Sequence, residues 1–329
     1  MSRTLPRLLF LLALLLAAVV AAVAAGSAGL TPATVLRALA GGATETERII
    51  VLELRMPRVA LAIVAGGGLA LSGAVFQALL RNPLAEPYIL GVSGGAAVGA
   101  IGVPLVLGGA AAAPWVLPVA ALVGALGAVA LVFRVALRVD RALDTRVLLL
   151  AGVVVGAFFN AVIMLLLTFT DTESFRGAMM WMMGNLGNAS WGGSLLLAAY
   201  VLPASAVLMA LARPLNLLAI GEETALYLGT RVERVKVAAY VVASLIVAAT
   251  VAQCGVVGFV GLVVPHTVRL LWGSDHRLLL PASFLGGGIF LLLADTAART
   301  LAGLNELPVG VVTALVGVPL FVTLLRRSA

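Results

Sequence analysis

The sequence predicts an all-α polytopic membrane protein with about ten transmembrane helices and both termini in the cytoplasm. Hydrophobic residues make up 62% of the chain and charged residues 11%, whereas soluble proteins carry about 25% charged residues. The apolar residues gather in runs near the length of about 20 residues that a helix needs to cross a bilayer. Many of the 36 glycines lie inside these runs, as in Gly66-Gly67-Gly68, and small residues let membrane helices approach closely.

The predicted spans follow one another along the whole chain. In order they are Leu8–Ala28, Val59–Leu80, Ile89–Val106, Trp115–Leu137, Val147–Thr170, Trp191–Leu211, Val237–Gln253, Val256–Trp272, Leu278–Leu301 and Pro308–Leu325. The seventh and eighth are short and meet at Cys254-Gly255, so a count of nine stays open. The first run, with Arg3 and Arg7 ahead of it, has features of a signal peptide. Because the rest of the chain is itself polytopic, we expect this span to be retained.

Charge sets the expected orientation of these spans. The net charge is +7, and the basic residues stand in short clusters between apolar runs. This pattern suits the positive-inside rule better than a phosphate-binding surface, so we expect no nucleic-acid partner. With ten spans and an inner N-terminus, the inner segments hold fifteen of the 21 Lys and Arg residues and the outer segments six. This asymmetry predicts that both termini lie in the cytoplasm and favours an even number of spans.

Two connecting segments are long enough to do more than connect. The outer segment Gly29–Pro57 contains Thr31-Pro32, a fair helix start. The inner segment Arg213–Lys236 has a helical apolar pattern and two adjacent acids, Glu222 and Glu223. No soluble second domain is visible, and residues 1–329 are therefore predicted to form a single transmembrane domain.

The chain carries no recognisable catalytic machinery. It has no G-x-x-x-x-G-K-[ST] motif, so if ATP drives this protein, another subunit supplies the nucleotide site. The single cysteine, Cys254, excludes an intrachain disulfide, and the two histidines, His266 and His276, lack the carboxylate motif of a metal site. We expect no enzyme activity, no catalytic residue, no metal ligand and no cofactor bound by this chain.

Charged residues inside the predicted spans are scarce. Asp295 and Arg299 lie on one helix face near the outer end of the ninth span, and their spacing fits both a structural ion pair and a functional site. An ion-coupled secondary carrier, the main alternative function, would need more buried carboxylates than this. Ser72, Gln77 and Asn160 could line a path, although such residues serve more often as hydrogen bonds between helices.

Ordered sequence blocks run along most of the chain. They include Arg55-Met56-Pro57-Arg58, Asn82-Pro83-Leu84-Ala85-Glu86-Pro87, Trp181-Met182-Met183-Gly184, Gly258-Phe259-Val260-Gly261, Leu293-Ala294-Asp295 and Glu306-Leu307-Pro308-Val309-Gly310. From Glu223 the inner segment also reads E-T-A-x-x-x-G, close to the E-A-A-x-x-x-G loop by which ABC permeases dock on their ATPases. In order and spacing these blocks resemble the permease family that imports ferric siderophores, haem and vitamin B12.

The resemblance implies a homodimer with a translocation path between its two copies, in the bacterial cytoplasmic (inner) membrane. Two ABC ATPase subunits, which bind ATP and Mg, would dock on the cytoplasmic face. A periplasmic or lipid-anchored substrate-binding protein would dock outside. A ferric siderophore is the first expectation for the cargo, with haem and cobalamin open, because the binding protein largely sets the substrate.

The matching positions give roles to three groups of residues. The cytoplasmic coupling segment, about 213–236, carries the ATPase-coupling residues Leu215, Gly221, Glu222, Glu223, Ala225 and Gly229. The resemblance assigns docking of the binding protein to Arg55, Arg58 and Arg299, and an inner gate to Asn82, Leu84 and Thr145. Arg146 departs from the family pattern, because the vitamin B12 branch has a small hydroxyl residue there.

Overall fold

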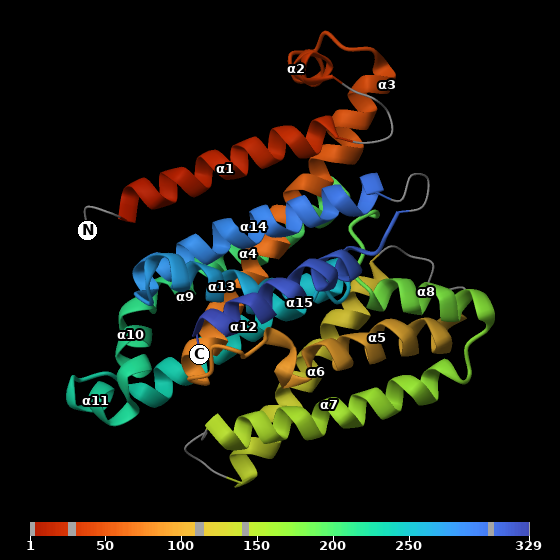
Figure 1. Cartoon of the computed structure of the whole chain (residues 1–329). Coiled ribbons are helices and arrows are strands. Elements are labelled where there is room, and N and C mark those ends of the chain that lie inside the picture. Colours follow the sequence, from red (N-terminus) through yellow and green to blue (C-terminus); the bar gives the residue numbers. More distant parts are fainter. Residues whose placement is uncertain (1–3, 26–30, 109–114, 140–144, 302–305, 329) are drawn as a thin grey trace.

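The computed structural model describes residues 4–25, 31–108, 115–139, 145–301 and 306–328, and these residues fold into helices and connecting turns without a β-strand (Figure 1). The helices are α1 (Thr4–Ala24), α2 (Pro32–Leu39), α3 (Glu45–Arg48), α4 (Met56–Leu79), α5 (Val92–Leu107), α6 (Val116–Val139), α7 (Thr145–Leu167), α8 (Thr172–Met182), α9 (Trp191–Ala210), α10 (Ala212–Ile220), α11 (Glu222–Tyr227), α12 (Val232–Cys254), α13 (Val260–Trp272), α14 (His276–Leu301) and α15 (Val309–Ser328). A π-helical stretch, η1 (Ile49–Arg55), precedes α4, and a 3-10 turn, η2 (Pro87–Leu90), precedes α5.

The prediction of an all-helical multi-pass membrane protein is confirmed. Within the described ranges, seven helices are long and apolar enough to cross a membrane. They are Thr4–Ala24, Glu45–Leu79, Val116–Val139, Arg146–Leu167, Trp191–Ala210, Val232–Cys254 and His276–Leu301. Three shorter apolar helices, Val92–Leu107, Val260–Trp272 and Val309–Thr323, coincide with the remaining predicted spans. The count of ten and the cytoplasmic termini stay predictions.

Helix α4 is the centre of the bundle. It packs against α14, α9, α12 and α13, and nearly all of its residues are buried. Glycine permits these close approaches, because a methyl group on Gly66 would overlap the backbone of Gly287 in α14. A methyl group on Gly73 would likewise overlap the backbone of Gly261 in α13. The glycine-rich runs of the sequence are therefore helix contacts, as expected for membrane helices.

The second span was predicted to begin at Val59, but the helix that contains it begins earlier. The chain is helical from Glu45, through η1, to Leu79. Thr44 starts this helix with a capping box, in which its side chain accepts the N–H of Glu47 and the Glu47 carboxylate accepts the N–H of Thr44. The helix start predicted at Thr31-Pro32 is confirmed, since Thr31 caps α2.

The seventh and eighth predicted spans are two separate helices, α12 and α13. Between them lies irregular backbone, with Gly255 and Phe259 both at a φ of +68°. Side chains satisfy this backbone: the Tyr88 hydroxyl donates to the Val257 carbonyl oxygen at 3.0 Å, and Glu86 accepts the Phe259 N–H at 2.9 Å. Non-helical backbone inside a membrane protein needs such internal partners.

Candidate functional site

The predicted coupling segment forms two short helices, α10 and α11, at one end of the bundle (Figure 1). Leu215 of α10 and Ala225 of α11 are fully buried and attach this pair to the bundle. The C-terminal turn of α11 is apolar and open: Tyr227, opposite Ala225, is 91% exposed, and Leu226 and the capping residue Leu228 are exposed beside it. The segment therefore combines an anchored inner face with an apolar outer face.

Gly229 ends α11 as the sequence predicts. Its φ is +80°, a conformation that favours glycine. The N–H of Gly229 donates to the Leu226 carbonyl oxygen, and the N–H of Thr230 donates to the Ala225 carbonyl oxygen, both at 2.9 Å. These two bonds are the Schellman motif, which fixes the end of a short helix. Glu223 lies exposed in the first turn of the same helix, and Gly221 directly precedes the first residue of this helix, Glu222.

A hydrogen-bond cluster ties α10 to the start of α14. Asn216 donates to the Asp275 carboxylate at 2.7 Å, and its side-chain oxygen accepts the backbone N–H of His276 at 2.9 Å. The N–H of Arg277 donates to the same carboxylate at 3.0 Å. These donors, the Arg277 N–H foremost, hold the pKa of Asp275 below its ordinary value.

A three-residue ion cluster ties α11 to α4 and α12. Lys236 Nζ lies 3.2 Å from Glu222 Oε1 and 3.3 Å from Glu222 Oε2. Arg81 Nη2 lies 3.5 Å from Glu222 Oε1. Lys236 is buried, whereas Glu222 and Arg81 remain partly open to solvent. We call Arg81, Glu222 and Lys236 the inner ion cluster.

The predicted gate residues lie directly after Arg81. Asn82 accepts the backbone N–H of Leu84 at 2.9 Å with its side-chain oxygen, which closes a tight turn. The Leu84 side chain is 41% exposed. Thr145 is the first residue of α7, but its side chain lies outside the described part of the protein. The gate assignment of these three residues stays a prediction.

Two of the predicted path residues are helix contacts inside this chain. The Ser72 hydroxyl donates to the Ala243 carbonyl oxygen of α12 at 3.3 Å. The Gln77 amide donates to the Leu262 carbonyl oxygen at 3.2 Å and accepts from Arg269 at 3.0 Å. Both side chains are buried. Asn160 differs, because it is exposed in the middle of α7.

The predicted docking arginines lie together at the other end of the bundle, where each has partners inside the chain. Arg55 and Arg299 donate to the carbonyl oxygens at the end of α1: Arg55 to Val23 and Ala24, and Arg299 to Ala22 and Ala25. A helix leaves its last carbonyl oxygens without intrahelical partners, and cations are favourable there. These two arginines therefore attach α1 to the bundle, and their docking role stays a prediction.

Arg58 is held between two carboxylates. Its Nε and Nη2 donate to buried Asp295 at 2.9 to 3.0 Å, and its Nη1 donates to Glu306 at 3.0 Å. Arg299 Nε lies 3.6 Å from Asp295. The Asp295–Arg299 pair expected from the sequence is thus present, and Arg58 is the principal partner of Asp295. We call Arg58, Asp295, Arg299 and Glu306 the outer ion cluster.

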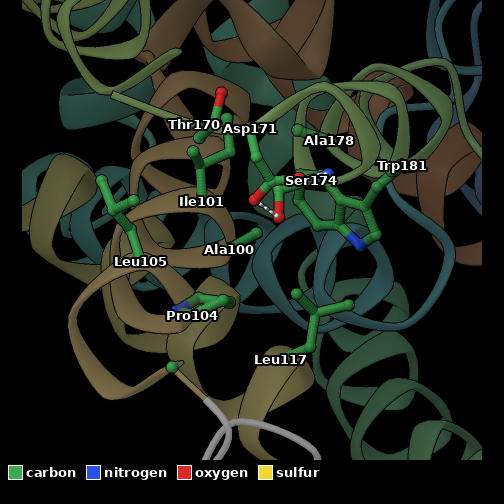
Figure 2. A pocket seen from close by; sticks show the side chains of 12 residues that line it. Ala100, Ile101, Pro104, Leu105, Leu117, Thr170, Asp171, Ser174, Ala178 and Trp181 are labelled. Atoms are coloured by element: carbon green, nitrogen blue, oxygen red, sulfur yellow. Dashed lines mark hydrogen bonds between the residues drawn. The ribbon is translucent and has the colours of Figure 1, made fainter. Parts of the chain in front are cut away.

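A cavity of about 520 Å³ opens between α5, α6 and α8 (Figure 2). Its walls are mostly apolar, and include Ile101, Pro104 and Trp181. The Ser174 hydroxyl donates to Asp171 at 2.8 Å on its polar side. Hydrogen bonds from Ser174 hold the pKa of Asp171 below its ordinary value. None of the predicted path residues lines this cavity.

Sequence reasoning did not single out Arg81, Lys236 and Glu306 as site residues. Arg81 and Lys236 entered only as charges that set the orientation, although Lys236 is the single lysine of the chain. Glu306 stood in a family-like block without a role. Their partners lie 14 to 248 residues away along the chain, so spacing in the sequence could not reveal these pairs.

Similar proteins were found at the level of sequence and of structure. The profile of the FecCD transport family matches residues 14–327. A cobalamin import system permease of Halobacterium salinarum is 45% identical over 289 residues, which cover 87% of this chain and 75% of that protein. A hemin transport system permease of Yersinia pestis is 41% identical over 286 residues, 84% of this chain and 83% of that protein. A solved inward-facing metal-chelate type ABC transporter superposes with a TM-score of 0.87 at 31% identity, covering 97% of this chain and 98% of that one.

Proposed function

Because the chain belongs to the FecCD transport family, we propose that it is the permease subunit of an ATP-driven importer that carries a metal chelate into the cytoplasm. It is a multi-pass protein of the cytoplasmic membrane, and its relatives are permeases rather than enzymes. The family match over residues 14–327 is the observation that carries the proposal. ATP and Mg then belong to a separate ATPase subunit.

We propose a metal tetrapyrrole as the cargo, cobalamin first and haem second. The names of the cobalamin and hemin permeases, each more than 40% identical to this chain, support this choice. The block Trp181-Met182-Met183-Gly184, which looks closer to the vitamin B12 branch, agrees with it. The ferric siderophore expected from the sequence stays a prediction that the same experiment tests.

The exposed face of α7 supports a homodimer. Val153 and Met164 are both more than half exposed, and Asn160 is exposed on the same side of the helix between them. An amide that faced lipid in the middle of a span would lack a hydrogen-bond partner, which is costly. This face therefore packs against a second copy or lines the path between two copies.

The open face of α11 supports docking of an ATPase. Tyr227, Leu226 and Leu228 give it a small apolar surface, with Glu223 beside them. Aromatic residues at the centre of an interface commonly carry much of the binding energy. Because Leu215 and Ala225 are buried against the bundle, a force that an ATPase applies to this surface is transmitted to the bundle.

Of the two carboxylates that hold Arg58 in the outer ion cluster, one can be displaced by a group on the binding protein. Glu306 is half exposed, whereas Asp295 is buried. A carboxylate of the binding protein would therefore replace Glu306 on Arg58 and leave the Arg58–Asp295 pair intact. Asp295 also lies between two arginines, which disfavours it as the proton- or ion-coupling site of a secondary carrier.

The proposal is tested in liposomes that contain this chain with a cobalamin-type ATPase and binding protein. Uptake of labelled cobalamin, haem and a ferric siderophore is measured with ATP, without ATP, and with a proton gradient alone. We expect ATP-dependent uptake of cobalamin, lost in Glu223→Arg. Uptake that follows the proton gradient and ignores ATP would refute the importer, and preference for the siderophore would refute the tetrapyrrole assignment alone.

A further inference from the structure

Arg81 adopts a backbone conformation that suits glycine better than arginine. Its φ is +46°, one of two positive values among the described non-glycine residues. The N–H of Arg81 donates to Ala78, and the N–H of Asn82 donates to Gln77. These bonds form a Schellman motif at the end of α4, with Arg81 in the position that helices usually give to glycine.

The Arg81 side chain offers a reason for this choice. Its guanidinium meets the Glu222 carboxylate across the space between α4 and α11, with Nη2 3.5 Å from Oε1. Glycine would form the turn more easily but would leave Glu222 without this partner. The position therefore combines an unfavourable backbone with a contact between two distant segments.

Lys236 fixes the other side of Glu222. Its ammonium group is buried in α12 and reaches both carboxylate oxygens. A buried ammonium without a carboxylate partner is costly, so Lys236 keeps Glu222 in place. Arg81 is the more exposed of the two cations, with a side chain 48% open to solvent, and its contact is the one that can break and reform.

The inner ion cluster joins two parts of the proposed machinery. Glu222 is the first residue of α11, which carries the exposed apolar surface. Arg81 immediately precedes Asn82, whose side chain closes the turn that presents Leu84. A rotation of α11 about the Lys236–Glu222 contact therefore shifts the carboxylate against Arg81 and acts on this turn, without passing along the membrane helices.

We propose that Arg81 and Glu222 transmit movement of the ATPase-coupling helix α11 to the gate turn at residues 82–84, with Lys236 as the fixed anchor. Arg81 is a positioning residue in this scheme, because it touches neither the cargo nor ATP. The inference rests on the proposed function and adds to it a route between the ATPase contact and the gate.

The test compares Arg81→Gly, Arg81→Lys, Glu222→Gln and the double variant Arg81→Gly with Glu222→Gln. Each is assembled with the ATPase and binding protein in liposomes, and labelled cobalamin transported per ATP hydrolysed is measured. Thermal stability of each purified complex is recorded in parallel. Arg138→Gln, which removes one positive charge from the last turn of α6 on the same predicted side of the membrane, is the matched control.

We expect Arg81→Gly to be at least as stable as the unchanged protein, because glycine suits the turn. Its transport per ATP should fall by about fivefold or more, the lower range of coupling between linked sites. Arg81→Lys should restore most of the ratio, the double variant should be no worse than Glu222→Gln alone, and the control should be unchanged. A purely structural role would instead lower stability and leave the ratio intact.

Each contrary result has a separate meaning. Normal transport per ATP in Arg81→Gly, or single effects that multiply in the double variant, would overturn the link and leave the importer standing. An unchanged protein that transports no chelate with ATP would refute the proposed function, and with it the link that depends on it.

Discussion

Replacing Gly73 by alanine tests whether close helix contact, rather than apolar burial alone, holds α4 in the bundle. A Cβ at Gly73 would overlap the Gly261 carbonyl oxygen of α13 and lie 2.7 Å from the Gly261 Cα. These atoms belong to the backbone, so no change of rotamer relieves the overlap and α13 must move. Overpacking typically costs about 1–3 kcal/mol, and the upper end applies here.

The higher helix propensity of alanine offsets part of this loss of stability. Alanine is better than glycine in a helix by about 1 kcal/mol, so the net loss should be about 2 kcal/mol, or a roughly 30-fold shift toward the unfolded state. Gly127 in α6 is the control, because a Cβ there meets nothing within 4 Å. Gly127→Ala should be neutral or stabilising.

The assay is unfolding of the detergent-purified protein by added sodium dodecyl sulfate, followed by circular dichroism. We expect Gly73→Ala to unfold at lower detergent fraction than the unchanged protein, and Gly127→Ala at an equal or higher one. Equal stability of Gly73→Ala and the unchanged protein would refute the reasoning, since it would mean that α13 can yield without loss.

Three further predictions concern charged and exposed residues. Asp295→Asn removes the buried carboxylate that Arg58 and Arg299 share and leaves Arg58 with Glu306 alone. It should cost about 3 kcal/mol of stability in the same assay, the lower end for a broken buried pair. Adding Arg58→Gln should recover part of this loss, and no loss in the single variant would contradict the reasoning. Because the native pKa of Asp275 is lowered, its carboxylate should stabilise the protein above about pH 4. The stability difference between the unchanged protein and Asp275→Asn should therefore vanish as pH falls below that value. A stability difference that stays constant from about pH 7 to about pH 3 would exclude this. Tyr227→Arg, at a 91% exposed position, should weaken ATPase binding in a pull-down while leaving thermal stability unchanged, and unchanged binding would remove Tyr227 from the docking surface.

Element type and order could be read from the sequence because lipid imposes long apolar runs. The predicted spans match helices with shifts of a few residues, except that the helix ahead of α4 reaches back to Glu45. Charged residues from Glu45 to Arg58 interrupt the apolar run Ile49–Leu52 there and hid the continuation of the helix. The glycine that ends α11 was also predictable, since a Schellman motif is local and depends on one residue, Gly229.

Site chemistry was only partly predictable. Arg55, Arg58 and Arg299 were expected together at the outer end, and they do lie together at one end of the bundle, whose side of the membrane stays a prediction. Their internal partners could not be read from the sequence, because a guanidinium can reach a carboxylate or any free carbonyl oxygen. Ser72 and Gln77 likewise fit a path or a helix contact equally well until their neighbours were known.

The sequence by itself determined that the helices of this protein lie in lipid, the order in which they follow one another, and the family to which the chain belongs. Those properties follow from composition and from residues that are near one another along the chain. Only the tertiary structure decided that Glu306 shares Arg58 with Asp295, and that Glu222 joins Arg81 to Lys236. An ion pair depends on the distance between charges in space, and helix packing alone brings together residues that the chain keeps far apart.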